Sequence, residues 1–119
     1  MASITVEVPE HLARRLQPFS TWLATVLELS LAGFKTPVAQ TVAEVIDFLS
    51  NGPSSAEVAD YTVSERANER VRRLLALNEA GLLSPEERSE LDEVEKLEHI
   101  LIMLKAEARE RIKKGSNSA

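Results

Sequence analysis

The first residues of the chain alternate between apolar and polar side chains. Apolar residues stand at positions 4, 6 and 8, and polar residues occupy the positions between them. A period of two residues is typical of a β-strand with one buried face. The pattern therefore predicts a short strand over residues 3–8 that ends at Pro9. Proline is also favoured at the first position of a helix, so Pro9 can begin the next helix.

Three helical segments are predicted between this strand and residue 51. The first has one apolar stripe and stops at Pro18. The second follows Ser20, a good N-cap, and is apolar on nearly every side from Trp22 to Phe34. A helix of this kind is expected to be buried on every side. The third can be capped by Thr36 and ends near Gly52, which suits a left-handed cap.

Cap signals also mark the helices of the C-terminal half. Ser54 and Glu57 have the spacing of a capping box, and Ser64 begins a helix of about four turns. The strongest local signal is Ser84-Pro85-Glu86-Glu87, in which serine caps the helix, proline takes its first position and Glu87 returns the capping hydrogen bond. The helix that it opens is expected to reach about Lys113, a length of roughly 43 Å at 1.5 Å per residue.

The predicted fold is mainly α, with a short N-terminal β-strand, five or six helices, and a long C-terminal helix in a helical hairpin. The chain divides into four parts. Residues 1–51 form a dimerisation half like a ribbon-helix-helix unit, and residues 52–64 form a hinge. Residues 65–114 form a helical hairpin, and residues 115–119 form a disordered tail.

The amino-acid composition excludes several kinds of functional site. The 119 residues include no cysteine and two histidines, which excludes disulfides and thiolate sites and nearly excludes a conventional zinc site. With 19 acidic and 14 basic residues the formal net charge is −5, which argues against strong nonspecific attraction to nucleic acid or anionic membranes. No apolar run approaches the roughly 20 residues of a membrane span, and no secretory signal is visible. A cytoplasmic, bacterial protein without cofactor or metal is the expectation.

The charges of the last helix are divided into two blocks. Acidic residues fill its first half and basic residues its second, an order that favours the helix macrodipole. The preceding helix carries arginines that could pair with the acidic half if the two helices fold back on each other. These are Arg66, Arg70, Arg72 and Arg73. The interpretation is a helical hairpin held by surface charges.

No constellation of residues indicates catalysis. His11 and His99 lie on separate predicted helices, without a partner motif. Glu95 and His99 are four residues apart on one helical face, but one such pair is a weak signal for a metal or a base. A glycine-rich phosphate loop is also absent. The protein is therefore predicted not to be an enzyme.

DNA binding is one alternative. A strand followed by two helices is the order of a ribbon-helix-helix unit, in which strands from two chains enter the major groove. The candidate contacts to DNA are Ser3, Thr5, Glu7, Arg14, Arg15, Ser20 and Thr21. The ribbon face has no lysine or arginine and Glu7 would repel phosphate, so a strand that serves only as a dimer ribbon or as an edge strand is the favoured interpretation.

Protein binding is the leading prediction. Residues 100–104 are apolar around a full turn of the last helix, and this turn needs cover either from the N-terminal half or from a second chain. The candidate partner-binding residues are Leu97, Leu101, Met103, Leu104, Lys105 and Arg109.

Two stretches resemble known families. Residues 4–16 and 27–33 resemble the start of small bacterial antitoxins and ribbon-helix-helix regulators, and residues 83–93, with Leu97-Glu98-His99 and Leu104-Lys105-Ala106, resemble an uncharacterised helical family of cyanobacteria. The resemblance implies an antitoxin-like homodimer whose C-terminal helices bind a partner such as a nuclease or toxin. A structural or adaptor subunit of a larger assembly and a DNA-binding regulator are the alternatives.

Overall fold

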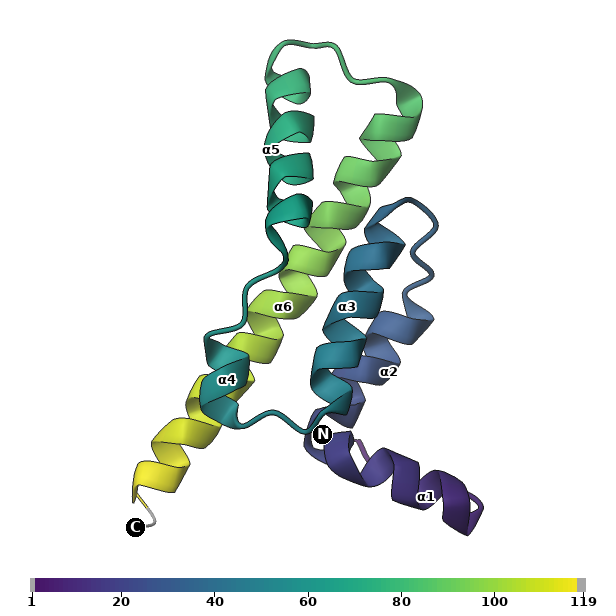
Figure 1. The fold of residues 1–119 in the computed structure, drawn as a ribbon, viewed down its shortest axis with the longest axis vertical. Helices are drawn as coiled ribbons and strands as arrows, with labels where there is room; N and C mark the ends of the chain where they lie inside the picture. Colours follow the sequence, from purple (N-terminus) through teal and green to yellow (C-terminus); the bar gives the residue numbers. More distant parts are fainter. Residues whose placement is uncertain (1, 118–119) are drawn as a thin grey trace.

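The computed structural model describes residues 2–117, with side chains through residue 115, and this part of the chain is mainly helical (Figure 1). The elements are α1 (Glu10–Leu16), the 3₁₀ helix η1 (Gln17–Trp22), α2 (Leu23–Leu31), α3 (Val38–Ser50), α4 (Ser55–Ala59), α5 (Glu65–Glu79) and α6 (Pro85–Asn117).

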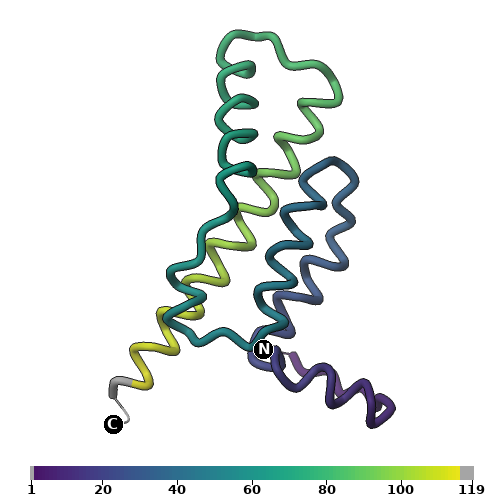
Figure 2. The backbone as a smooth tube through the Cα atoms, viewed as in Figure 1, coloured from purple at the N-terminus to yellow at the C-terminus, as the bar shows by residue number. Residues whose placement is uncertain are grey.

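The long helix α6 is the axis of the molecule. Helices α2 and α3 pack along one side of it, and α4 and α5 pack along the other (Figures 1 and 2). Helix α1 instead projects sideways from the end of α2, away from α6. The predicted long C-terminal helix is therefore confirmed, and every other large element except α1 is positioned against it.

The main core lies where α2, α3 and α4 meet the middle and C-terminal parts of α6. Val45, Leu49 and Val58 are completely buried there. The apolar stripes of α3 and α6 supply most of the remaining core, as their spacing of three and four residues predicts. These core residues are Trp22, Val26, Leu29, Val38, Val42, Leu97, Ile100, Leu104 and Ala108.

The segment predicted as a hinge, residues 52–64, contributes to this core. It contains α4, whose capping box is complete: the Glu57 amide donates to Ser54 Oγ at 3.1 Å and the Ser54 amide donates to Glu57 Oε1 at 2.9 Å. The Trp22 indole N–H also donates to the Pro53 carbonyl at 3.0 Å. The indole hydrogen bond attaches the segment to η1, and the buried side chain of Val58 packs it into the core.

Helices α5 and α6 form the predicted hairpin. Ser64 accepts a hydrogen bond from the Ala67 amide at 3.3 Å, and Ser84 and Glu87 cap each other at 3.1 and 3.0 Å. Hydrogen bonds from Ser84 hold the pKa of Glu87 below its ordinary value. The hairpin has its own small apolar contact, since Ala67, Leu74 and Leu91 are buried. These cap predictions are confirmed.

The predicted strand over residues 3–8 is wrong for this chain. Residues 2–9 have no regular secondary structure, and among the described residues no backbone–backbone hydrogen bond involves residues 2–8. A strand requires a neighbouring strand, and one copy of the chain offers none. The apolar side chains of the pattern are therefore left in water, with Ile4 89% exposed.

The second predicted helix differs from expectation in two ways. Ser20 is not an N-cap, because it lies inside η1 and donates its hydroxyl to the Gln17 carbonyl at 3.2 Å. The α-helix begins only at Leu23. It is also not buried on every side, since Leu27 and Leu31 face solvent. The physical reason is that one chain of this size has elements for only one face of α2.

Helix α6 continues past its expected end near Lys113 to Asn117. The first residues of the predicted disordered tail, 115–117, are therefore helical, and residues 118–119 lie outside the described part of the chain. No helix among the described residues is both long enough and apolar enough to cross a membrane.

Candidate functional site

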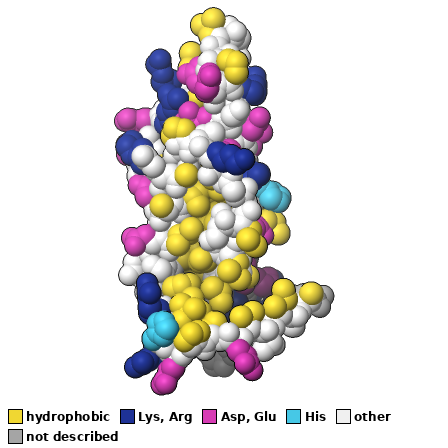
Figure 3. Space-filling model, turned by 90° about the vertical axis from the view of Figure 1, so that its right-hand side faces the viewer, with side chains coloured by type: hydrophobic (Ala, Val, Ile, Leu, Met, Phe, Trp, Pro, Cys, Tyr) yellow, Lys and Arg dark blue, Asp and Glu magenta, His cyan; other side chains and the backbone are white. Residues whose placement is uncertain are grey.

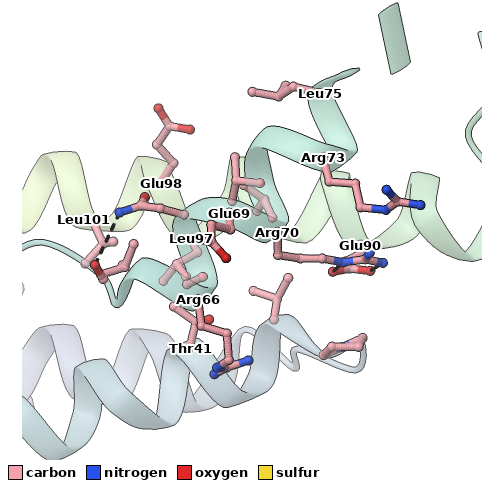
Figure 4. A pocket seen from close by; sticks show the side chains of 17 residues that line it. Thr41, Arg66, Glu69, Arg70, Arg73, Leu75, Glu90, Leu97, Glu98 and Leu101 are labelled. Carbon is pink, nitrogen blue, oxygen red and sulfur yellow. Dashed lines mark hydrogen bonds and ion pairs between the residues drawn. The ribbon is translucent and has the colours of Figure 1, made fainter. Parts of the chain in front are cut away.

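A groove of about 660 Å³ opens between α3, α5 and α6 (Figure 4). We call it the α3–α5–α6 groove. Its base is apolar and comes mainly from α6, with Val94, Leu97 and Leu101, and from Val71 of α5. A concave site of this size with an apolar base takes one or two side chains of a ligand.

Arginines line the α5 wall of the groove at a spacing of four and three residues, Arg66, Arg70 and Arg73. This spacing places them on one helical face. Arg70 is fully engaged: its Nε and Nη2 donate to the two oxygens of Glu90, both at 2.8 Å, and these hydrogen bonds raise its pKa. Glu90 is only 4% exposed, whereas the Arg70 side chain is 42% exposed, so water reaches the guanidinium side of this ion pair.

The other two arginines of the wall are more available. Arg66 lies 3.8 Å from Glu44 in an exposed pair and donates to Gln40 at 3.1 Å. Among the described residues, Arg73 has neither a hydrogen bond nor an ion pair within 4.0 Å. In Figure 4 the carboxylate of Glu98 points away from Arg66. Glu69 also lines this wall, so the wall presents the guanidinium groups of Arg66 and Arg73, which can take a carboxylate from outside, beside one carboxylate of its own.

The α3 wall is held in place by Glu93 of α6. Its carboxylate accepts hydrogen bonds from the Lys35 amide at 2.8 Å and from the Thr36 amide and hydroxyl at 3.0 and 2.6 Å. Burial raises the pKa of Glu93, but these hydrogen bonds and the charge of Lys96 outweigh burial, and the pKa lies below its ordinary value. Thr36 in turn accepts from the Val38 amide at 3.2 Å, but the N-cap position of α3 is held by Pro37 rather than by the predicted Thr36.

A second surface lies between α2 and another face of α6. We call it the α2–α6 surface. It is a shallow, open depression whose apolar residues are Ala24, Leu27, Leu31, Ala32 and Ile100, with Glu28, Lys96 and His99 among them. Leu31 is 84% exposed. Figure 3 shows hydrophobic side chains gathered over the lower half of one face of the molecule, while charged side chains dominate its upper half.

The predicted partner-binding residues do not form one surface. Leu97 and Leu104 are buried in the core, and Leu101 is partly buried at the base of the groove. Met103 is exposed four residues after His99 and so extends the α2–α6 surface. Lys105 and Arg109 line neither surface. Within the turn at residues 100–104, Ile100 and Leu104 are buried in the core of the same chain, whereas Ile102 and Met103 stay exposed.

The predicted DNA-contact residues are all exposed but are not arranged as a reading surface. Ser3, Thr5 and Glu7 lie on an irregular segment rather than on a ribbon. Ser20 and Thr21 lie within η1, so their amides are not at the start of an α-helix. Arg14 and Arg15 lie in the last turn of α1.

Neither histidine has a catalytic arrangement around it. His11 is exposed on α1, and His99 is exposed on the α2–α6 surface. In the described part of the chain, no three side chains of histidine, aspartate or glutamate are placed to hold a metal ion.

The sequence pattern did not indicate the α3–α5–α6 groove, the α2–α6 surface or the role of Glu93. The arginine spacing at 66, 70 and 73 was a usable signal for the groove wall. Glu93, however, pairs with backbone amides 57 and 58 residues away, and nothing in the local pattern indicates such a contact. The chain matches no family model, no curated protein and no solved structure.

Proposed function

We propose that the protein is a non-enzymatic, antitoxin-like interaction module that binds a partner protein through its C-terminal helices. The observation that carries the proposal is the α3–α5–α6 groove, with its apolar base and row of arginines. Arginine beside buried apolar area is typical of the centre of protein interfaces. A nuclease or toxin is the kind of partner that the resemblance implies.

The chemistry of the groove favours an acidic segment of the partner. An apolar side chain of that segment would enter between Val71 and Leu101, and flanking carboxylates would bind Arg66 and Arg73. Guanidinium groups bind carboxylates with paired, charge-assisted hydrogen bonds. Among the candidate residues of the C-terminal helix, Leu101 would contact the partner at the base of the groove, and the buried Leu97 would support that base from the core.

The proposal includes a homodimer. Residues 3–34 carry exposed apolar side chains both on the N-terminal segment and on α2. Large apolar residues gathered at a surface favour association, and they are more readily covered by a second chain than left in water.

The test of partner binding is a comparison of variants purified from the protein's own cells. The groove variant is Arg66→Glu with Arg73→Glu. The control is Lys113→Glu with Lys114→Glu, which changes the net charge equally at exposed positions near the end of α6. We expect a protein that co-elutes at fixed stoichiometry with the wild type and the control, and is lost or weakened at least about tenfold with the groove variant. A partner retained equally by the groove variant contradicts the proposed site. Co-elution with a large, stable assembly instead makes the protein an adaptor.

A further inference from the structure

Residues 2–16 protrude from the molecule and have little support from their own chain. Helix α1 buries none of its seven residues and packs mainly against the adjoining η1. The preceding segment carries Ile4, Val6 and Val8 exposed to solvent. Figures 1 and 3 show this part of the chain extending sideways from the body. We call residues 2–16 the N-terminal arm. Its apolar side chains Ile4, Val6 and Val8 have no partner surface in their own chain.

The same chain also carries an apolar surface without an occupant. On the α2–α6 surface, Leu27 and Leu31 project from α2 beside Ile100 of α6. The N-terminal arm of the same chain leaves both leucines exposed. A single polypeptide therefore holds an uncovered element and an uncovered surface of matching apolar character, which is the condition for reciprocal association of two identical chains.

The charges on the two parts are complementary. The arm carries Glu7 and Glu10 first and then Arg14 and Arg15. The α2–α6 surface carries Lys96 and His99 on its α6 side and Glu28 on its α2 side. If an arm crosses the surface from α6 to α2, its acidic residues meet Lys96 and its arginines meet Glu28. Complementary charge at the edge of an apolar contact selects the partner and fixes its orientation.

We propose that a second copy of this chain occupies the α2–α6 surface, with the N-terminal arm of each copy lying across the surface of the other. The interface is two-fold symmetric and buries the apolar side chains of the arm twice. This inference rests on the proposed homodimer. It differs from pairing of two N-terminal strands, because here the arm contacts helices α2 and α6 rather than another arm.

Crosslinking tests the contact directly. Because the natural chain has no cysteine, the introduced cysteines are the only thiols that can react. One batch carries Val6→Cys, and a second, differently tagged batch carries Leu31→Cys. After mixing, a short bis-maleimide should join the two tagged chains. The control pairs Val6→Cys with Leu82→Cys, since Leu82 is also apolar and 68% exposed but lies outside the surface. The control mixture should give no crosslinked pair.

Sedimentation equilibrium of charged variants gives the second measurement. Leu31→Glu and Val6→Glu should each weaken the dimer at least about tenfold, whereas Leu82→Glu should not. All three positions are exposed in one chain, so helical content measured by circular dichroism should remain unchanged.

The outcomes separate the inference from the proposed homodimer. A wild-type protein that remains monomeric at all concentrations overturns both the proposed homodimer and the proposed contact of the arm with the α2–α6 surface. A dimer that survives Leu31→Glu and gives no crosslink between positions 6 and 31 overturns the inference and leaves the homodimer standing. Loss of partner binding in the groove variant has no bearing on any of these results.

Discussion

Among the described residues, Glu90 is the most deeply buried charged side chain, and its partner Arg70 joins α5 to α6. Removing the arginine leaves a buried carboxylate without its counter-charge, which is far more unfavourable than removing both groups. Because Arg70 itself is 42% exposed, water partly compensates for its loss, and we expect Arg70→Ala to lower the free energy of unfolding by roughly 1 to 2 kcal/mol. The double variant Arg70→Met with Glu90→Leu should recover most of that loss, as urea denaturation would measure.

Arg72→Ala is the matched control for this pair. Arg72 contacts Glu65 at 3.2 Å, but both side chains are exposed. Its loss should change stability by less than about 1 kcal/mol. Equal effects of Arg70→Ala and Arg72→Ala would mean that the Arg70–Glu90 contact is no stronger than a surface pair.

Glu93 predicts a pH dependence of stability. Its pKa is lower in the folded protein than the ordinary value of 4.5. A carboxyl of this kind stabilises the fold above its unfolded pKa, and that contribution is lost as the pH falls through the folded pKa. We expect Glu93→Gln to be roughly 1 kcal/mol less stable than the wild type at neutral pH. The difference should shrink below about pH 4.5, as thermal unfolding at several pH values would show.

Glu95→Gln provides the comparison for Glu93→Gln, because Glu95 is exposed on the same helix. Its stability difference from the wild type should stay small at every pH. A Glu93→Gln difference that stays constant on acidification would exclude the carboxylate charge as its cause.

At the scale of the element, the end of α3 depends on Gly52. Its φ of +67° is unfavourable for other residues, and a Cβ there would lie 2.5 Å from the Pro18 carbonyl oxygen. Gly81 has a similar φ of +71° but open space around it. Gly81→Ala should therefore lower stability by about 1 kcal/mol through backbone strain alone. Gly52→Ala should lower it by a further 1 to 3 kcal/mol or so, since η1 must move. Equal losses in thermal unfolding would show that η1 yields without resistance.

How well each element could be predicted depended on where its determinants lie. The starts of α4, α5 and α6 followed from local caps such as Ser54 with Glu57 and Ser84 with Glu87, because a capping box needs only four residues. The strand over residues 3–8 could not be decided locally, since its backbone requires a partner. The α-helical start at Leu23, after a 3₁₀ turn, also had no local signal.

At the scale of the whole molecule, the sequence indicated a mainly helical protein with a long C-terminal helix but not how its parts meet. The apolar turn at residues 100–104 required cover from several sides, and the pattern left open whether its own N-terminal half or a second chain supplies it. In the structure α2, α3 and α4 bury Ile100 and Leu104, whereas Ile102 and Met103 stay exposed. Periodicity identifies which helical face is apolar, but long-range packing decides how much of that face remains free.

The α3–α5–α6 groove and the α2–α6 surface share α6, which contributes a different face to each. Helix α6 has 33 residues, so it is about 50 Å long and spans the longest dimension of the molecule. Ligands held at the two sites would thus be connected by one continuous rod rather than by a flexible linker. Their separation and mutual orientation would be set by the helix itself, and the protein would act as a rigid spacer that presents two bound molecules to each other at a fixed angle.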